Sequence, residues 1–140
     1  MRKFIKLHRK SKKISWGSAP DVKKRVKHLA SSLNLVWIKP TRIFCVRSKN
    51  ANTRAYARIW GLAKIWQDVL RIKPAYIIEV ISEKYDRLPL VEQDKILLHE
   101  ITHIPKNFSG ALAPHIRSGK RSFHSKLELL VAQYLNRFEI

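Results

Sequence analysis

Three stretches of the chain place apolar residues three and four positions apart, which is the spacing of an amphipathic helix. They are residues 18–34, 89–104 and 120–138. Ser18 is a candidate N-cap for the first helix. Pro20 and Asp21 suit its first turn, which tolerates a missing N–H and favours negative charge. Pro105 ends the second helix, because proline disfavours helical geometry at the residue before it.

Extended segments lie between these helices. β-branched and aromatic residues are dense over residues 42–47 and 75–81, which predicts two strands. Residues 54–60 and 64–69 also look extended, although residues 62–70 fit a short helix equally well. Strands and helices mixed in this order predict an α+β fold. We expect a small antiparallel or mixed sheet packed on the second predicted helix.

Positive charge is concentrated in the first half of the chain. Residues 1–67 hold 18 Lys and Arg against one acid, whereas residues 68–140 hold 11 against nine, and the net charge is +19. The block 1–14 carries seven positive charges and no acid, so it cannot fold by itself. We therefore expect a basic N-terminal arm at 1–14 and a single domain at 15–140.

A field of this size favours a polyanionic partner, and nucleic acid is the commonest polyanion inside cells. We expect RNA, ribosomal RNA first, rather than DNA, and no amphipathic anchor supports a membrane surface instead. Trp16, beside the arm, is the best candidate for an exposed stacking ring, and most other tryptophans are expected in the core. The candidate nucleic-acid-binding residues are Arg2, Lys3, Lys6, Arg9, Lys10, Lys12, Lys13, Lys23, Lys24 and Lys27.

Length and cysteine content indicate the number of domains and the cellular compartment of the protein. A chain of 140 residues fits one domain with a modest core. No apolar run approaches the 18 residues of a membrane span, and the basic start lacks the apolar segment of a secretory signal. The single cysteine, Cys45, cannot form an internal disulfide, which favours a reducing, cytoplasmic setting. The oligomeric state is not determined by these features.

The strongest motif is His99-Glu100-Ile101-Thr102-His103. Residues four apart on a helix share one face, so both imidazoles can reach one metal ion with Glu100 beside them. This is the H-E-x-x-H arrangement of zinc hydrolases, in which two histidines bind Zn²⁺ and the glutamate takes a proton from water. The apolar run before the motif places much of this helix in the core.

A third ligand must come from later in the chain. His115 ranks first because it ends a loop that can fold back on the helix, His124 ranks second, and Glu128 ranks third. For His124, a surface histidine of a basic helix is an equally good interpretation. The metzincin pattern is excluded, since it requires glycine and histidine where the chain has Lys106 and Ser109.

The segment from Leu98 to His115 resembles the signature of the phage-type metallopeptidase family. The elements that carry the resemblance are Ile104-Pro105, Phe108-Ser109-Gly110 and Pro114-His115, and the likeness covers about residues 16–116. The family resembles a minimal zincin, in the style of SprT-like proteins. The resemblance implies His99, His103 and His115 as zinc ligands and Glu100 as general base. The basic arm lies outside it.

Two hypotheses remain. In the first, the protein is a zinc metallopeptidase that aligns a peptide substrate along the edge of the strand at 76–81. Tyr76, Tyr85 or Lys106 would then stabilise the oxyanion, and nothing in the sequence selects among them. In the second, the protein is an RNA-binding, ribosome-associated protein whose zincin scaffold and metal site are structural. The two hypotheses are compatible if a peptidase is docked to a nucleoprotein.

Overall fold

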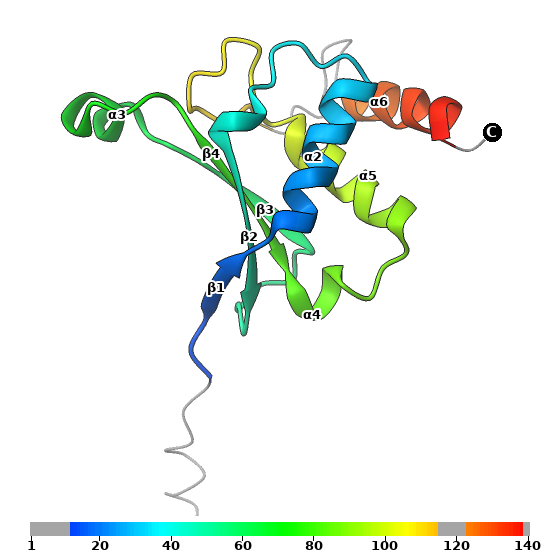
Figure 1. Cartoon of the computed structure of the whole chain (residues 1–140), viewed down its shortest axis with the longest axis horizontal. Helices are drawn as coiled ribbons and strands as arrows, with labels where there is room; N and C mark the ends of the chain where they lie inside the picture. The colour runs from blue at the N-terminus through cyan, green and yellow to red at the C-terminus, as the bar shows by residue number, and fades with distance from the viewer. Residues whose placement is uncertain (1–11, 115–122, 139–140) are drawn as a thin grey trace, which may run out of the picture.

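Ten secondary-structure elements are found in the computed structural model, which describes residues 12–114 and 123–138 (Figure 1). In chain order they are β1 (Ser15–Ser18), α2 (Pro20–Ser32), the short 3₁₀ helix η1 (Pro40–Arg42), β2 (Ile43–Lys49), β3 (Ala57–Gly61), α3 (Lys64–Leu70), β4 (Tyr76–Ile81), α4 (Ser82–Tyr85), α5 (Leu90–Ile101) and α6 (Phe123–Phe138).

The strands form one mixed sheet in the order β1-β2-β4-β3. Strands β2 and β4 are parallel, and the outer strands β1 and β3 pair antiparallel to them. The chain between β2 and β4 contains β3 and α3, which gives the long connection that parallel neighbours require. The expected α+β fold with a small mixed sheet is confirmed.

Helices cover one face of this sheet. Figure 1 shows α2, α5 and α6 on the same side of the strands. Side chains alternate between the faces of a strand, so every second residue of β2 and β4 points towards the helices. Ile43, Ile78 and Val80 are fully buried there against Leu29 of α2 and Leu97 of α5. Removal of these apolar side chains from water is the main stabilising force for the domain.

A buried carboxylate joins the three covering helices. Asp94 of α5 is completely buried and accepts hydrogen bonds from Arg25 of α2, at 2.6 Å for the shorter one, and from the Tyr134 hydroxyl of α6 at 2.8 Å. A buried charge is tolerated only when it is paired and hydrogen-bonded, as here. Asp94 therefore fixes how α6 lies against the helix that carries the histidine motif.

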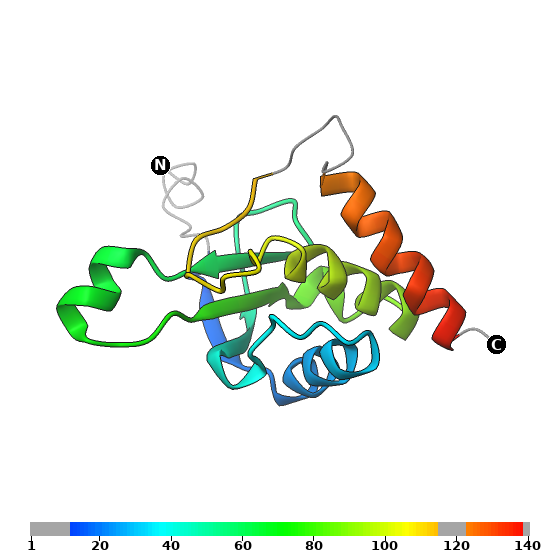
Figure 2. The ribbon, with the colours of Figure 1, turned by 90° about the horizontal axis from the view of Figure 1, so that it is seen from above.

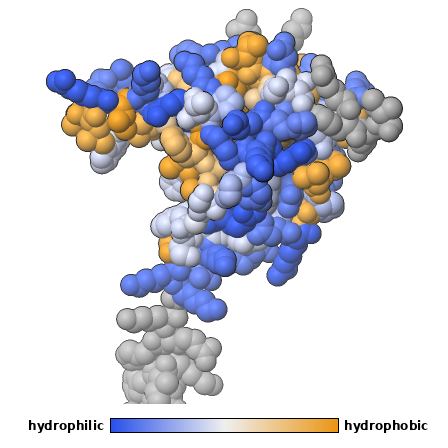
Figure 3. Space-filling view, viewed as in Figure 1, coloured by the Kyte–Doolittle hydropathy of each residue, from blue (hydrophilic) through white to orange (hydrophobic). Residues whose placement is uncertain are grey.

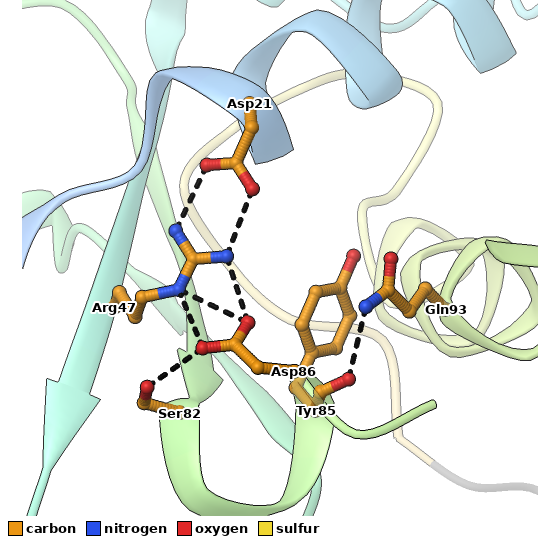
Figure 4. Close-up of polar contacts among 6 residues, drawn as sticks. All are labelled: Asp21, Arg47, Ser82, Tyr85, Asp86 and Gln93. Atoms are coloured by element: carbon orange, nitrogen blue, oxygen red, sulfur yellow. Dashed lines mark hydrogen bonds and ion pairs between the residues drawn. The ribbon is translucent and has the colours of Figure 1, made fainter. Parts of the chain in front are cut away.

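A second polar cluster fastens α2 and α4 to the sheet (Figure 4). Arg47 of β2 donates to Asp21, in the first turn of α2, and to Asp86, which follows α4, with shortest distances of 2.8 Å to each. The Ser82 hydroxyl donates to the same Asp86 carboxylate. The hydrogen bonds from Arg47 lower the pKa of Asp21 to about 2.

The start of the first helix differs from the sequence prediction. Ser18 is not an N-cap but the last residue of β1, where it pairs with Val46 of β2. Helix α2 begins after Ala19, whose side chain cannot cap it, and the Ala19 amide donates to the Cys45 carbonyl instead. Strand pairing supplies more backbone hydrogen bonds than a serine cap would, so the tertiary contact overrides the local signal.

The ambiguous segment at 64–69 is a helix and not a strand. Helix α3 projects beyond the sheet in both views (Figures 1 and 2), held by Gln67, whose side-chain amide donates to the carbonyls of Leu62 and Ser109. Apolar side chains gather on the outside of this projection (Figure 3). They are Ile65, Trp66, Val69 and Leu70, each more than half exposed.

No helix among residues 12–114 and 123–138 is long and apolar enough to cross a membrane. Residues 1–11 of the expected basic arm lie outside the described residues, so the arm stays a prediction.

Candidate metal centre

Helix α5 carries the first part of the motif and buries one side of it. Leu97, Leu98 and Ile101 are fully buried, which anchors the helix end that bears His99 and Glu100. The α-helix ends at Ile101, three residues earlier than predicted, and His103 lies in the tighter turn that follows. The rings of His99 and His103 still lie close, with centroids 5.5 Å apart.

The side chain of His103 is oriented by the backbone of a later loop. Its Nδ1 lies 2.7 Å from the carbonyl oxygen of Ala113. The Ala113 amide donates a hydrogen bond to the His103 carbonyl oxygen, and this distance is also 2.7 Å. A carbonyl only accepts, so Nδ1 carries the proton of this bond, and the lone pair of the neutral ring is on Nε2. Metal-binding histidines are commonly fixed in this way.

Several contacts hold the loop that ends at Ala113. The Tyr76 hydroxyl donates to the Ala111 carbonyl at 2.7 Å and accepts from the Gly110 amide at 2.8 Å. Gly110 has a φ of 94°, a conformation that favours glycine. A Cβ on Gly61 of β3 would lie 2.1 Å from the Gly110 carbonyl oxygen, so two glycine backbones are in close contact here. The Phe-Ser-Gly element therefore docks the loop on the sheet.

Glu100 faces a pocket of about 460 Å³ between α5, α6 and the start of β3. Its side chain is only 10% exposed, and its Oε2 lies 4.0 Å from His99 Nε2. Burial disfavours the charged carboxylate and raises the pKa of Glu100 to about 7. The residues that line the pocket are Ala55, Tyr56, Ala57, Lys95, Ile96, His99, Glu100, Leu127 and Val131. A carboxylate in this apolar setting is a stronger base than one in water.

The donor set fits a metal in part. Two imidazoles one turn apart, one of them with its Nδ1 engaged, match two of the ligands that a zinc site requires. Within residues 12–114 and 123–138, no three His, Cys, Asp or Glu side chains form a group that could hold a metal. Glu128 is exposed on α6 and completes no such group. His115 and the side chain of His124 lie outside the described residues, so their roles as ligands stay predictions.

The three residues predicted from the sequence to stabilise the oxyanion lie away from the pocket at Glu100. Tyr76 is 1% exposed, and its hydroxyl is engaged by the loop at Gly110 and Ala111. Tyr85 is 2% exposed, and burial raises its pKa. The Lys106 ammonium lies over the ring of Trp37, 5.7 Å from its centroid. None of the three lines the pocket at Glu100.

Sequence reasoning missed the two polar side chains that do line this pocket beside the motif. Tyr56 precedes β3, and Lys95 lies one helical turn before His99 on α5. Lys95 could have been found from the sequence, because residues four apart on a helix lie on the same face. No sequence signal connected Tyr56 with the motif, because the two are brought together only by the packing of β3 on α5.

The prediction that a peptide substrate aligns along the edge of the strand at 76–81 is wrong. Strand β4 is an interior strand, paired on one side with β2 and on the other with β3, so it has no edge for an added peptide. Strands β1 and β3 are the two edges of the sheet among the described residues, and β3, which pairs only with β4, is the edge that reaches the pocket at the motif. Ala57, its first residue, lines the pocket beside His99 and Glu100. The sequence could show which segments are strands but not their order.

The sequence model of the family described as putative phage metallopeptidase matches residues 14–127, which is most of the chain. The chain belongs to this phage metallopeptidase family. The match includes the histidine motif, the docked loop and the position of His115, and it begins at Ile14, so the seven cations of the basic segment lie outside it. Neither the search of curated proteins nor that of solved structures returned a match.

Membership of the phage metallopeptidase family suggests a divalent metal, commonly zinc, and a peptidase activity. The residues that the geometry brings together agree with this chemistry: two imidazoles, a buried carboxylate beside them and an open pocket in front. The fold and the family therefore point to the same site.

The candidate nucleic-acid residues are only partly within the described region. Lys12, Lys13, Lys24 and Lys27 are exposed. Lys23 instead donates hydrogen bonds to the carbonyls of Pro40 and Ile43, so its ammonium helps to hold α2 against the start of β2. Arg2, Lys3, Lys6, Arg9 and Lys10 lie outside the described residues.

The tryptophans differ from expectation. Trp16 is 56% exposed, as predicted, but Trp60 and Trp66 are also about half exposed. Trp37 alone among the four packs against the core, and its Nε1 donates to the Ile104 carbonyl. The prediction that most tryptophans belong to the core is therefore wrong, because β1, β3 and α3 each present one to solvent.

Proposed function

We propose that the protein is a zinc-dependent peptidase whose metal is held by His99, His103 and His115. The observation that carries this proposal is the paired contact of Ala113 with His103, which brings the chain back to the motif two residues before His115. Zn²⁺ at such a site supplies Lewis-acid polarisation of a peptide carbonyl and acidifies water. The remaining steps belong to the protein's own side chains.

Glu100 acts as the general base in this proposal. Its buried carboxylate takes a proton from the attacking water and then delivers it to the amine of the leaving peptide. The apolar walls of the pocket exclude bulk water and so strengthen each electrostatic contact with the reacting groups. Tyr56 and Lys95, which line the same pocket, are the donors available to the developing oxyanion.

The substrate is an extended peptide added to the open edge of β3. Main-chain pairing along a strand edge provides affinity with little side-chain specificity. Because Ala55, Tyr56 and Ala57 line the pocket, a peptide paired with the first half of β3 would pass in front of Glu100. The second half of β3 is less accessible, since Gly61 is packed against the loop at Gly110.

The experiment compares Glu100→Gln with Glu92→Gln, an exposed glutamate on the same helix. Both proteins should bind one equivalent of zinc, measured by metal analysis after dialysis. Cleavage of an unfolded protein substrate should fall by about 100-fold or more in Glu100→Gln and stay unchanged in Glu92→Gln. Equal cleavage by the two variants would remove Glu100 from the mechanism.

A second candidate is RNA binding, with the zinc site structural. It is favoured by the net charge of +19 and by exposed Lys12, Lys13, Lys24 and Lys27 on or near α2 and β1. Such cations give sequence-independent affinity that falls steeply with salt. The two functions combine if the peptidase is docked on a ribosome or another nucleoprotein in the cytoplasm.

Co-sedimentation with ribosomes at low and high salt tests this second candidate. We expect binding at low salt that is lost as salt rises, and competition by added RNA more than by duplex DNA. A protein that stays in the supernatant at low salt would exclude the docking proposal and leave the peptidase proposal intact.

A further inference from the structure

The sheet face opposite the helices carries a row of three exposed apolar side chains, two of them aromatic. Phe44 of β2 is paired with Ile77 of β4, and Ile77 is paired with Trp60 of β3, so the three side chains lie side by side across the sheet. They are 48%, 40% and 48% exposed. Neighbouring strands lie about 4.8 Å apart, which places Phe44 and Trp60 about 10 Å from each other. Among the described residues, the covering helices α2, α5 and α6 lie on the other side of the strands (Figure 1).

Each ring of the row has a cation beside it. The Arg58 guanidinium lies 5.2 Å from the Trp60 ring centroid, and the Arg42 guanidinium lies 5.7 Å from that of Phe44. The Lys23 ammonium is 5.9 Å from the same Phe44 ring. Aromatic rings flanked by cations recognise a ligand that is both flat and anionic.

The acid on this face is neutralised and holds one ring in position. Glu79 is fully buried, and its carboxylate accepts hydrogen bonds from Arg58 at 2.7 Å and from Trp60 Nε1 at 2.8 Å. Its negative charge is therefore matched by Arg58. The Trp60 ring is fixed before any ligand arrives, which lowers the entropy lost on binding.

We propose that this face, formed by Phe44, Ile77 and Trp60, binds the unpaired bases of a single-stranded RNA. Bases stack on the two rings while Arg42 and Lys23 attract the phosphates, and Arg58, whose charge is matched by Glu79, flanks the Trp60 ring. Duplex RNA keeps its bases stacked inside the helix and is a poorer ligand for this face. The inference rests on the RNA affinity proposed above and adds the place where bases are bound.

The experiment measures binding of the full-length protein to a fluorescently labelled single-stranded RNA of mixed sequence, by anisotropy at fixed salt. A strand of the same length without bases is the second probe, because it keeps the phosphates and lacks the stacking groups. The variants are Trp60→Leu and Phe44→Leu. The control is Trp66→Leu, which removes a tryptophan of similar exposure (58%) from α3. Thermal unfolding checks that each variant is folded.

We expect Trp60→Leu and Phe44→Leu each to weaken binding of the base-bearing strand by at least about fivefold. Trp66→Leu should leave that binding unchanged, and all proteins should bind the strand without bases equally and weakly. Phe44 makes no hydrogen bond through its ring, so its variant remains informative if loss of the Trp60–Glu79 bond unfolds the protein.

Three results would overturn the inference. Unchanged RNA binding in both sheet variants would show that cations elsewhere supply all the affinity, and RNA docking itself would stand. An equal loss in Trp66→Leu would show a general effect of removing apolar surface. A wild-type dimer in sedimentation analysis that becomes monomeric in Phe44→Leu would identify the face as a contact between two copies. Absence of any RNA binding by the wild-type protein would instead reject the docking proposal on which this one rests.

Discussion

Nδ1 of His103 and the carbonyl oxygen of Ala113 lie 2.7 Å apart, and the backbone of the same two residues forms a second hydrogen bond of equal length. These two bonds close a loop of nine residues, 104–112, at the end of the histidine helix. The loop therefore supports the candidate metal centre, and changes in its docking should alter the positions of the proposed ligands.

Gly61→Ala tests that dependence. The added methyl group would lie 2.1 Å from the Gly110 carbonyl oxygen, so the loop or β3 must move, whereas a methyl on Gly17 of β1 meets nothing within 4 Å. We expect Gly61→Ala to lower the free energy of unfolding by about 2 kcal/mol or more and to weaken zinc binding. Gly17→Ala should change stability by less than about 0.5 kcal/mol. Denaturant titration and competition with a zinc chelator measure both, and equal zinc affinity in the two variants would contradict the coupling.

Tyr56→Phe tests the oxyanion donor. If the Tyr56 hydroxyl stabilises charge that exists only in the transition state, kcat falls by about 100-fold and KM stays unchanged. Lys95→Met is the matched variant, because Lys95 lines the same pocket. A loss of kcat in Lys95→Met alone would assign the role to the lysine.

Tyr134→Phe tests the docking of α6. The hydroxyl donates to the buried Asp94 at 2.8 Å, and its loss removes one partner from a carboxylate that keeps Arg25. We expect the free energy of unfolding to fall by about 1–2 kcal/mol, measured by urea denaturation. Tyr56→Phe is the control for stability, since that side chain is 45% exposed. An equal effect in both variants would show that Asp94 does not hold α6.

Asp21 makes the domain sensitive to acid. Hydrogen bonds from Arg47 lower the Asp21 pKa from 3.8 to about 2 in the folded protein. A lowered folded pKa gives stability that is present above the unfolded pKa and is lost as pH falls through the folded one. Asp21→Asn should therefore be less stable than the wild type above about pH 4, with the difference shrinking towards pH 2.

Denaturation of both proteins over this pH range measures the difference. Asp68→Asn is the control, because its i,i+4 pair with Lys64 is exposed on both sides and contributes little. A constant gap between the Asp21→Asn and wild-type curves would contradict the linkage to Arg47.

Much of the fold could be predicted from local sequence patterns. The helices at α2, α5 and α6 follow from apolar spacing, and β2 and β4 follow from runs of β-branched residues, since each pattern reflects one face of the element against the core. Strand β1 was missed because it is short and exposed along its whole length, so it carries no burial pattern. The segment at 64–69 was ambiguous because most of α3 faces solvent.

The sequence by itself determined the chemistry of the site: two histidines and a glutamate at helical spacing, in a chain with strong positive charge. Those properties depend on residue types and on contacts four positions apart, which the chain specifies locally. Tertiary structure alone decided that β3 is an edge strand, that Tyr56 lines the same pocket as Glu100 and that Ala113 orients His103. Each of these relations joins segments far apart in the chain, and sheet order and loop docking fix them through packing.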